Sequence, residues 1–104
     1  MNALAQARAL VTDIGQHPDH FGERLTEAAR ILCSAARAEP SNTEVLTCFG
    51  ALLSDLGKHE EAARVLHAAI KAGSQDRNTH FNIGVALINL AAHEEAMGFF
   101  KQAN

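Results

Sequence analysis

Two consecutive stretches of the sequence are built alike: residues 43–76 read TEVLTCFGALLSDLGKHEEAARVLHAAIKAGSQD, and residues 77–104 read RNTHFNIGVALINLAAHEEAMGFFKQAN. Glycine and apolar residues coincide when the two stretches are aligned 34 residues apart. The coinciding pairs include Gly50 with Gly84, Leu53 with Leu87, Ala62 with Ala96 and Leu66 with Phe100. A repeat of about 20 to 50 residues is typical of a solenoid, in which each unit buries its apolar face by stacking on the next. We therefore expect a protein that presents a binding surface and has no deep catalytic pocket.

The whole chain is predicted to be α-helical. Its 104 residues suit one domain, 47% of them are hydrophobic, and only two prolines interrupt stretches rich in strong helix formers. The periodicity predicts helices at residues 2–15, from Phe21 to before Pro40, at 43–56, 60–72 and 77–90, and from Glu94 onward, with a loop at 16–20. Asp19, and either Asn42 or Thr43, are candidate N-caps. The expected buried stripes of the first two helices are Leu4, Ala7, Leu10, Val11 and Ile14, then Phe21, Leu25, Ala28, Leu32, Ala35 and Ala36.

The spacing inside the two stretches resembles the tetratricopeptide repeat (TPR) family. That family places a glycine after a bulky residue in its first helix, and Ala, an aromatic residue and a second Ala at one-turn intervals in its second helix. The matching residues are Phe49-Gly50, Ala62, Leu66 and Ala69, then Ile83-Gly84, Ala96, Phe100 and Ala103. The resemblance implies an all-α domain over residues 1–104, in which antiparallel helical hairpins stack as a right-handed TPR superhelix, an α-solenoid.

The three expected units do not match the family equally well. Residues 43–76 and 77–104 follow the pattern, although the second unit lacks the capping helix that commonly ends such arrays. Residues 2–42 carry Ala28, Leu32 and Ala35 at second-helix positions and Pro40 at the proline position that follows, but the loop before them is longer than the pattern has. We therefore predict a degenerate N-terminal hairpin at residues 2–42.

The resemblance also implies where a ligand would bind, because the first helix of each hairpin lines the groove in this family. The corresponding residues are Thr47, Ala51 and Asp55 in one repeat and Asn78, Phe81, Asn82, Val85, Ile88 and Asn89 in the next. The helix at 77–90 has one apolar stripe for its core and a surplus stripe at Phe81, Val85 and Ile88. Two interpretations stay open: the surplus stripe binds an amphipathic helix or an extended peptide with apolar anchors, or the N-terminal helix or a wall of the superhelix covers it.

Some members of the family hold the C-terminal carboxylates of chaperones with a clamp of Lys, Asn and Arg. This chain has Asn78 and Asn82 at the cationic positions and Cys48 at the Asn position. Without a cation the groove cannot offset the desolvation of two carboxylates. The pattern therefore disfavours an adaptor for chaperone tails.

A second candidate surface lies near the end of the sequence. Phe100 occupies a core position, whereas Met97 and Phe99 are expected to have no following repeat on which to pack. An exposed apolar patch of this kind favours a protein contact. We name Met97 and Phe99 as a candidate self-association edge through which the chain forms a homo-oligomer.

Other chemistry has little support in the sequence. The net charge is −3, which argues against nucleic acid as a partner. Cys33 and Cys48 do not have metal-ligand spacing, and no third ligand stands beside His17 and His20, so neither a metal site nor a cofactor is expected. The Glu60-Glu61 and Glu94-Glu95 pairs fall in first turns of helices, where they complement the helix dipole. No catalytic residue is expected.

The expected function is therefore a non-catalytic scaffold that binds a peptide or helix of a partner protein. The alternatives are a self-association module, a fragment of a longer TPR array, or a regulatory domain of a larger enzyme. The sequence has neither a secretory signal nor a run of about 18 uncharged apolar residues that would span a membrane. A cytoplasmic location without membrane insertion is expected.

Overall fold

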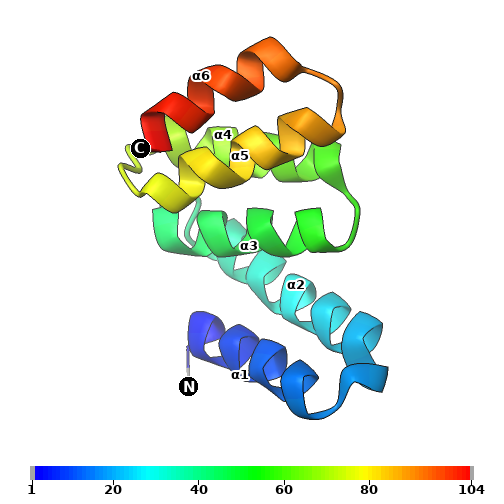
Figure 1. The fold of residues 1–104 in the computed structure, drawn as a ribbon. Coiled ribbons are helices and arrows are strands. Elements are labelled where there is room, and N and C mark those ends of the chain that lie inside the picture. The colour runs from blue at the N-terminus through cyan, green and yellow to red at the C-terminus, as the bar shows by residue number, and fades with distance from the viewer. Residues whose placement is uncertain (1, 104) are drawn as a thin grey trace.

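The computed structural model describes residues 2–103, which form six α-helices and one short 3-10 helix. The helices are α1 (Ala3–Gln16), α2 (Phe21–Ala38), α3 (Thr43–Asp55), α4 (His59–Lys71), α5 (Arg77–Asn89) and α6 (His93–Ala103), and the 3-10 helix η1 spans Pro18–His20. Sequential helices pair as antiparallel hairpins, and α3 and α5 lie side by side with α4 behind them (Figure 1). The all-helical hairpin architecture predicted from the sequence is confirmed. The ends of the predicted domain, Met1 and Asn104, lie outside the described residues.

Short polar side chains cap the N-termini of the first helix in each hairpin. The side-chain oxygens of Asn2, Asn42 and Asp76 accept hydrogen bonds from backbone N–H groups in the first turns of α1, α3 and α5, at 2.8, 3.1 and 2.8 Å. These bonds satisfy amides that have no partner inside the helix. Asn42 is thus the cap of α3, and Thr43 is the first residue of the helix. Asp19 is not a cap, because it lies inside η1 and α2 begins without a side-chain cap.

The three turns that follow α3, α4 and α5 require left-handed backbone. Gly57 and Gly73 adopt φ values of 81° and 100°, which glycine reaches without steric cost. Ala91 occupies the place of Gly57 in the next repeat and has a φ of 63°. A residue with a Cβ atom is strained in this region by about 1 to 2 kcal/mol. The fold therefore requires a left-handed residue at all three turns. Glycine meets this requirement at two of them, and the strained Ala91 occupies the third.

Small residues bring the helices of each repeat together. Gly50 on α3 is buried against α4, where a Cβ atom would lie 2.5 Å from Cγ of Leu66. Gly84 repeats this arrangement, with a Cβ position 2.6 Å from Cε1 of Phe100 on α6. Ala62 and Ala96 are completely buried at the same crossings. These contacts explain why glycine and alanine recur after 34 residues.

The core is divided into three clusters that follow one another along the array. The first joins α1 and α2 to α3 through Ala7, Leu25, Ala28, Leu32, Val45 and Leu52. The second joins α3 and α4 to α5, and the third lies between α4, α5 and α6. Each repeat therefore buries apolar surface mainly against its immediate neighbours, as a solenoid does.

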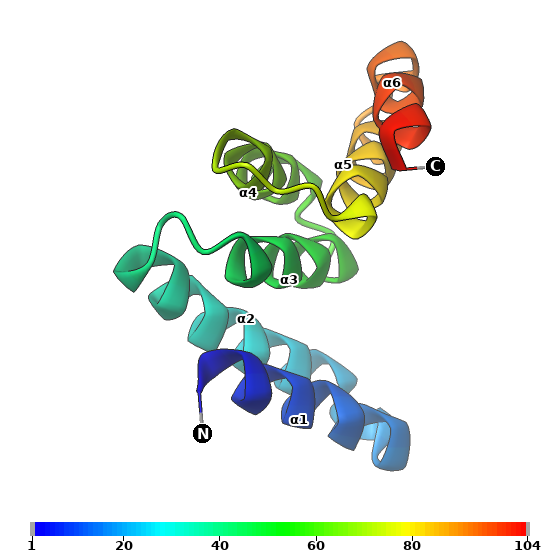
Figure 2. The ribbon, with the colours of Figure 1, turned by 90° about the vertical axis from the view of Figure 1, so that its left-hand side faces the viewer.

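The first hairpin is arranged differently from the other two. α1 packs on α2, which in turn packs on α3, whereas the first helices of the later repeats, α3 and α5, contact each other directly. Figure 2 shows α1 and α2 as a pair at one end of the molecule, inclined to the helices above them. The prediction that Phe21 and Val11 are buried is wrong, because their side chains are 51% and 42% exposed. Phe21 is the first residue of α2, and Val11 projects from α1 into the space between α1 and α3.

Candidate functional site

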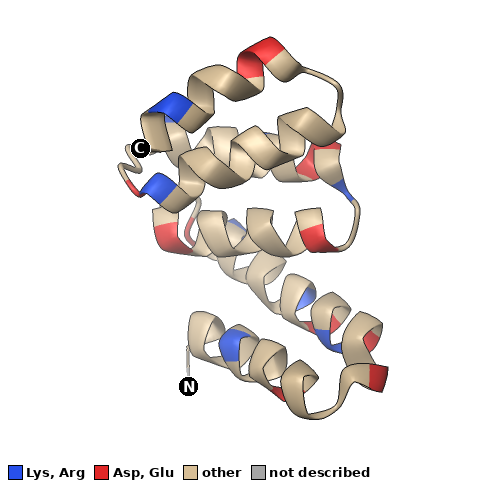
Figure 3. Cartoon of the chain, in the orientation of Figure 1, with Lys and Arg blue, Asp and Glu red and all other residues tan. Residues whose placement is uncertain are grey.

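The surplus apolar stripe on α5 is open to solvent. Phe81 and Ile88 are 52% and 40% exposed, and Val85 between them is half-buried. The alternative in which the N-terminal helix covers this stripe is wrong, because α1 packs on α2 at the opposite end of the molecule (Figure 2). Arg77 is the only charged residue of α5, and the rest of that helix is uncharged in Figure 3. The stripe is therefore an exposed surface with little charge.

Three asparagines border the stripe. Asn78 and Asn89 are exposed and Asn82 is half-buried. The amide of Asn89 donates to the backbone carbonyl of Val85 at 3.0 Å, which directs this side chain along its own helix. Amides that both donate and accept can bond to the backbone of a bound segment. Their role as groove residues stays a prediction.

Thr47 does not lie in the groove, and this prediction is wrong. Its side chain is 8% exposed, and its hydroxyl lies 2.7 Å from the hydroxyl of the completely buried Thr79 on α5. The hydroxyl of Thr79 is also 2.8 Å from that of Ser74 in the turn before α5. The three hydroxyls satisfy one another where α3 meets α5. The family pattern could not show this, because it assigns the position to the groove whatever the neighbouring side chain is.

A hollow of about 460 Å³ lies between α1 and α3, on the face formed by α1, α3 and α5. We call it the α1–α3 hollow. Ala51 and Asp55, both predicted groove residues, line it from α3. The other lining residues, none of which was among the predicted binding residues, are Leu4, Ala7, Arg8, Val11, Thr12, Leu32, Cys48 and Leu52. Most of these residues are apolar. One sequence signal could have pointed to the lining residues on α1, such as Arg8 and Val11: they belong to the first hairpin, whose spacing departs from the repeat.

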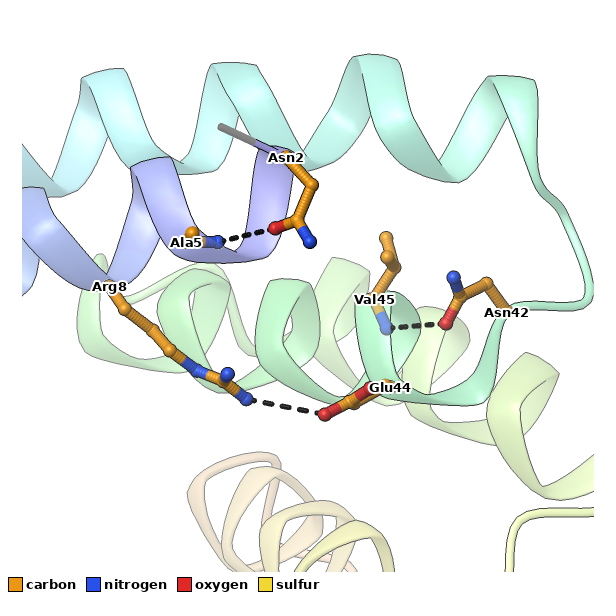
Figure 4. A network of polar contacts seen from close by, with 6 residues as sticks. All are labelled: Asn2, Ala5, Arg8, Asn42, Glu44 and Val45. Carbon is orange, nitrogen blue, oxygen red and sulfur yellow. Dashed lines mark hydrogen bonds and ion pairs between the residues drawn. The ribbon is translucent and has the colours of Figure 1, made fainter.

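The two ends of the α1–α3 hollow differ in charge. Near the start of α3, Nη2 of Arg8 lies 3.4 Å from Oε1 of Glu44, so an ion pair joins α1 to α3 across the opening (Figure 4). Both side chains are nearly two-thirds exposed, and such a pair adds little stability. At the far end of α3, Asp55 has no ion-pair partner within residues 2–103, and partial burial raises the pKa of its carboxyl. The hollow therefore combines an apolar lining with one uncompensated acid.

Phe81 also borders a second hollow, beside the start of α5 and the end of α6. Its ring centroid is 5.7 Å from that of Phe100, and the opening of about 520 Å³ is further lined by Arg77, Asn78 and Ala103. The ring of Phe81 thus leans toward α6, away from α3. Val85 and the three asparagines recur at spacings of three and four residues and therefore share one side of α5.

The two residues of the predicted self-association edge have different surroundings. Met97 is 54% exposed. Phe99 is only partly exposed, because its ring packs against His67 of α4 and His80 of α5, with centroids 5.5 and 6.4 Å apart. The expectation that Phe99 has nothing to pack on is therefore wrong, since α6 turns this residue back onto the preceding helices. Self-association through Met97 stays a prediction.

Residues 2–103 contain no group of three His, Cys, Asp or Glu side chains placed to hold a metal ion. The rings of His17 and His20 stack with centroids 5.8 Å apart. Cys33 and Cys48 are free thiols, each partly exposed. Over the same residues, no helix has both the length and the apolar character needed to cross a membrane.

Comparison with known proteins identifies the fold. No protein-family model matches the chain, and no curated protein has a significantly similar sequence. Solved structures of MamA are similar. The structure named MamA MSR-1 has a TM-score of 0.71 at 24% identity over 98% of this chain and 66% of its own. For MamA AMB-1 the TM-score is 0.72 at 24% identity, with 94% of this chain and 65% of that chain covered.

A third structure, described as the crystal structure of MamA, has a TM-score of 0.75 at 18% identity over 98% of this chain and 56% of that one. The chain thus spans about 56 to 66% of the length of these three proteins. At such low identities the similarity shows the fold alone. The chain therefore shares the helical-repeat solenoid of MamA.

Proposed function

We propose that this chain is a non-catalytic protein-interaction scaffold of the TPR family, and that it binds a helix or peptide of a partner protein on the face formed by α1, α3 and α5. The observation that carries the proposal is the α1–α3 hollow, an opening of about 460 Å³ that is lined mainly by apolar side chains. Helical ligands of this kind bind through apolar anchors spaced three and four residues apart.

The chemistry of the face suggests which segment would bind. An apolar anchor of the ligand would fill the α1–α3 hollow, and a second apolar side chain would contact Val85 on α5. A Lys or Arg near the first anchor would pair with Asp55, whose carboxyl is partly desolvated and has no counter-ion within the described chain. Such a charge-assisted bond is stronger than a neutral one. We therefore propose an amphipathic segment with apolar anchors and a basic residue as the ligand.

A display library of helix-forming peptides tests the proposal without knowledge of the natural partner. Peptides that bind the chain are selected, and their affinities are measured by fluorescence polarisation against the wild type and three variants. Ala51→Glu places a charge in the hollow and Val85→Glu places one on the α5 stripe. Ala68→Glu makes the same kind of change at an exposed position of α4 and serves as the control.

We expect Ala51→Glu and Val85→Glu each to weaken binding at least about tenfold, and Ala68→Glu to leave it unchanged. Asp55→Asn is expected to reduce affinity mainly for peptides that contain Lys or Arg. A library that yields no binder, or binders that are indifferent to both groove variants, would contradict the proposal.

A further inference from the structure

A second surface lies where α5 and α6 form the last hairpin, and it includes Phe81 and Ile88, which the sequence pattern had assigned to the groove. Phe81, Ile88 and Met97 project from these two helices and are 52%, 40% and 54% exposed. We call the surface formed by these three residues the end face. No other helix within residues 2–103 packs on this side of α5 and α6 (Figure 2). Large apolar side chains gathered on one surface are typical of a protein contact.

The internal repeat shows what this position in the array normally contacts. Thirty-four residues before Phe81, Ile88 and Met97 stand Thr47, Ser54 and Ala63. Thr47 is buried by its contact with Thr79, and Ala63 is buried in a cluster with Ala86. Both Thr79 and Ala86 belong to α5. The equivalent surface of the preceding hairpin is therefore the surface that the next helix covers.

The end face differs from that internal junction in one respect. The polar Thr47, the small Ala63 and Ser54 are replaced by the larger, apolar Phe81, Met97 and Ile88. A helix that docked on the end face would contact apolar side chains. At the internal junction, α5 instead contacts the hydroxyl of Thr47. The end face thus continues an interface already present in the fold, with more apolar surface to bury.

The charges beside Met97 point to the occupant. Glu94 and Lys101 stand three residues before and four residues after Met97, so all three share one side of α6. Both charged residues are exposed, and neither has an ion-pair partner within the described chain. If two α6 helices cross antiparallel, Glu94 of each copy faces Lys101 of the other, with Met97 at the centre. This surface is complementary to itself, as a two-fold contact requires.

We infer that a second copy of this chain covers the end face, in a two-fold symmetric dimer whose α6 helices lie antiparallel. The dimer buries Phe81, Ile88 and Met97 and pairs Glu94 with Lys101 across the axis. It leaves the α1–α3 hollow, at the other end of each copy, free for a ligand. Dimer formation is tested at Glu94, Met97 and Lys101 of α6, and groove binding is tested at Ala51 and Val85, so the two proposals can fail separately.

Charge reversal and charge exchange test the arrangement directly. Light scattering after size exclusion, and sedimentation over about a hundredfold range of concentration, report the dimer dissociation constant. Glu94→Lys and Lys101→Glu are each expected to raise that constant at least about tenfold, because like charges then face each other. The double variant carrying both changes is expected to restore it to within about threefold of wild type, since the exchanged charges again pair.

Two further variants complete the test. Met97→Lys is expected to weaken the dimer at least about tenfold. Glu60→Lys makes the same charge change at the equivalent position of α4 and is expected to leave the dimer unchanged. Circular dichroism checks that each variant keeps its helix content, and the charge exchange decides the matter if Met97→Lys does not fold.

Three results would overturn the inference: a monomer at every concentration, a dimer that ignores Met97→Lys in the folded protein, or a double charge exchange that fails to restore association. If the second of these results came with a dimer weakened by Val85→Glu, it would place the contact on the groove face.

Discussion

The close approach of α3 and α4 at Gly50 predicts an unusual response to alanine. A Cβ atom on Gly50 would lie 2.5 and 2.6 Å from Cγ and Cδ2 of Leu66, and Leu66 is completely buried, so its side chain has nowhere to move. Overpacking of this kind costs about 1 to 3 kcal/mol. Replacing a helical glycine by alanine gains about 1 kcal/mol of helix propensity. The net expectation for Gly50→Ala is a loss of about 0 to 2 kcal/mol in the free energy of unfolding.

Gly98 offers a matched control within the same fold. It lies inside α6, and no atom would be within 4 Å of a Cβ at this position. Gly98→Ala is therefore expected to stabilise the protein by about 1 kcal/mol through helix propensity alone. The two glycine-to-alanine changes should differ by about 1 to 3 kcal/mol, which corresponds to at least several degrees in melting temperature for a domain of this size.

Urea unfolding followed by far-ultraviolet circular dichroism measures both free energies. A double-mutant cycle with Leu66→Ala then identifies the cause. Leu66→Ala alone should cost about 2 to 5 kcal/mol because it opens a cavity, and it should cost at least about 1 kcal/mol less when Gly50→Ala is present to occupy part of that space. Equal stabilisation by Gly50→Ala and Gly98→Ala, or strictly additive effects in the cycle, would refute the close-packing argument.

Three other positions yield predictions of different kinds. Ala91→Gly should raise the free energy of unfolding by about 0.5 to 1 kcal/mol in thermal or urea unfolding, because it removes the strain of a φ of 63° at the cost of a more flexible unfolded chain; a destabilised variant would show that the turn is unstrained. Thr79→Val should cost about 1 to 3 kcal/mol by leaving the buried hydroxyl of Thr47 without that partner, and adding Thr47→Val should recover part of the loss; no recovery would mean that the hydroxyl contact is not the cause. Burial raises the pKa of Asp55 above its ordinary value of 3.8, so the ionised carboxylate opposes folding at neutral pH, and this penalty fades as the pH falls through the raised pKa toward the ordinary one. Asp55→Asn should therefore raise the melting temperature at pH 7, where the acid is charged, but not well below the ordinary pKa, and a shift of the same size at both pH values would contradict this cause.

The hairpin architecture was predictable because its causes are local and repeated. The close contacts need glycine or alanine, as at Gly50 and Ala62, and the same needs recur 34 residues later. Helix starts were predictable where a short polar residue precedes the helix, as at Asn42. The start of α2 was harder, because η1 leads directly into the helix and no side chain caps it.

The candidate sites depended on contacts between distant parts of the chain. Repeat spacing placed Ala51 and Asp55 on the predicted groove face, but only the packing of the first hairpin opened the α1–α3 hollow beside them. Phe99 looked free in the sequence, and the rotation of α6 placed it against His67.

Helix propensity, turn chemistry and spacing are properties of residues close together in the chain, and they alone specified the helices and the order in which they stack. Whether a given side chain is buried depends on the residue that arrives opposite it from another helix. Thr47 and Phe81 occupy the same repeat position, yet Thr47 is enclosed by α5 and Phe81 is exposed because no helix within residues 2–103 follows α6. Tertiary structure therefore decided which surfaces remain for partners, since exposure is set by neighbours and not by the residue itself.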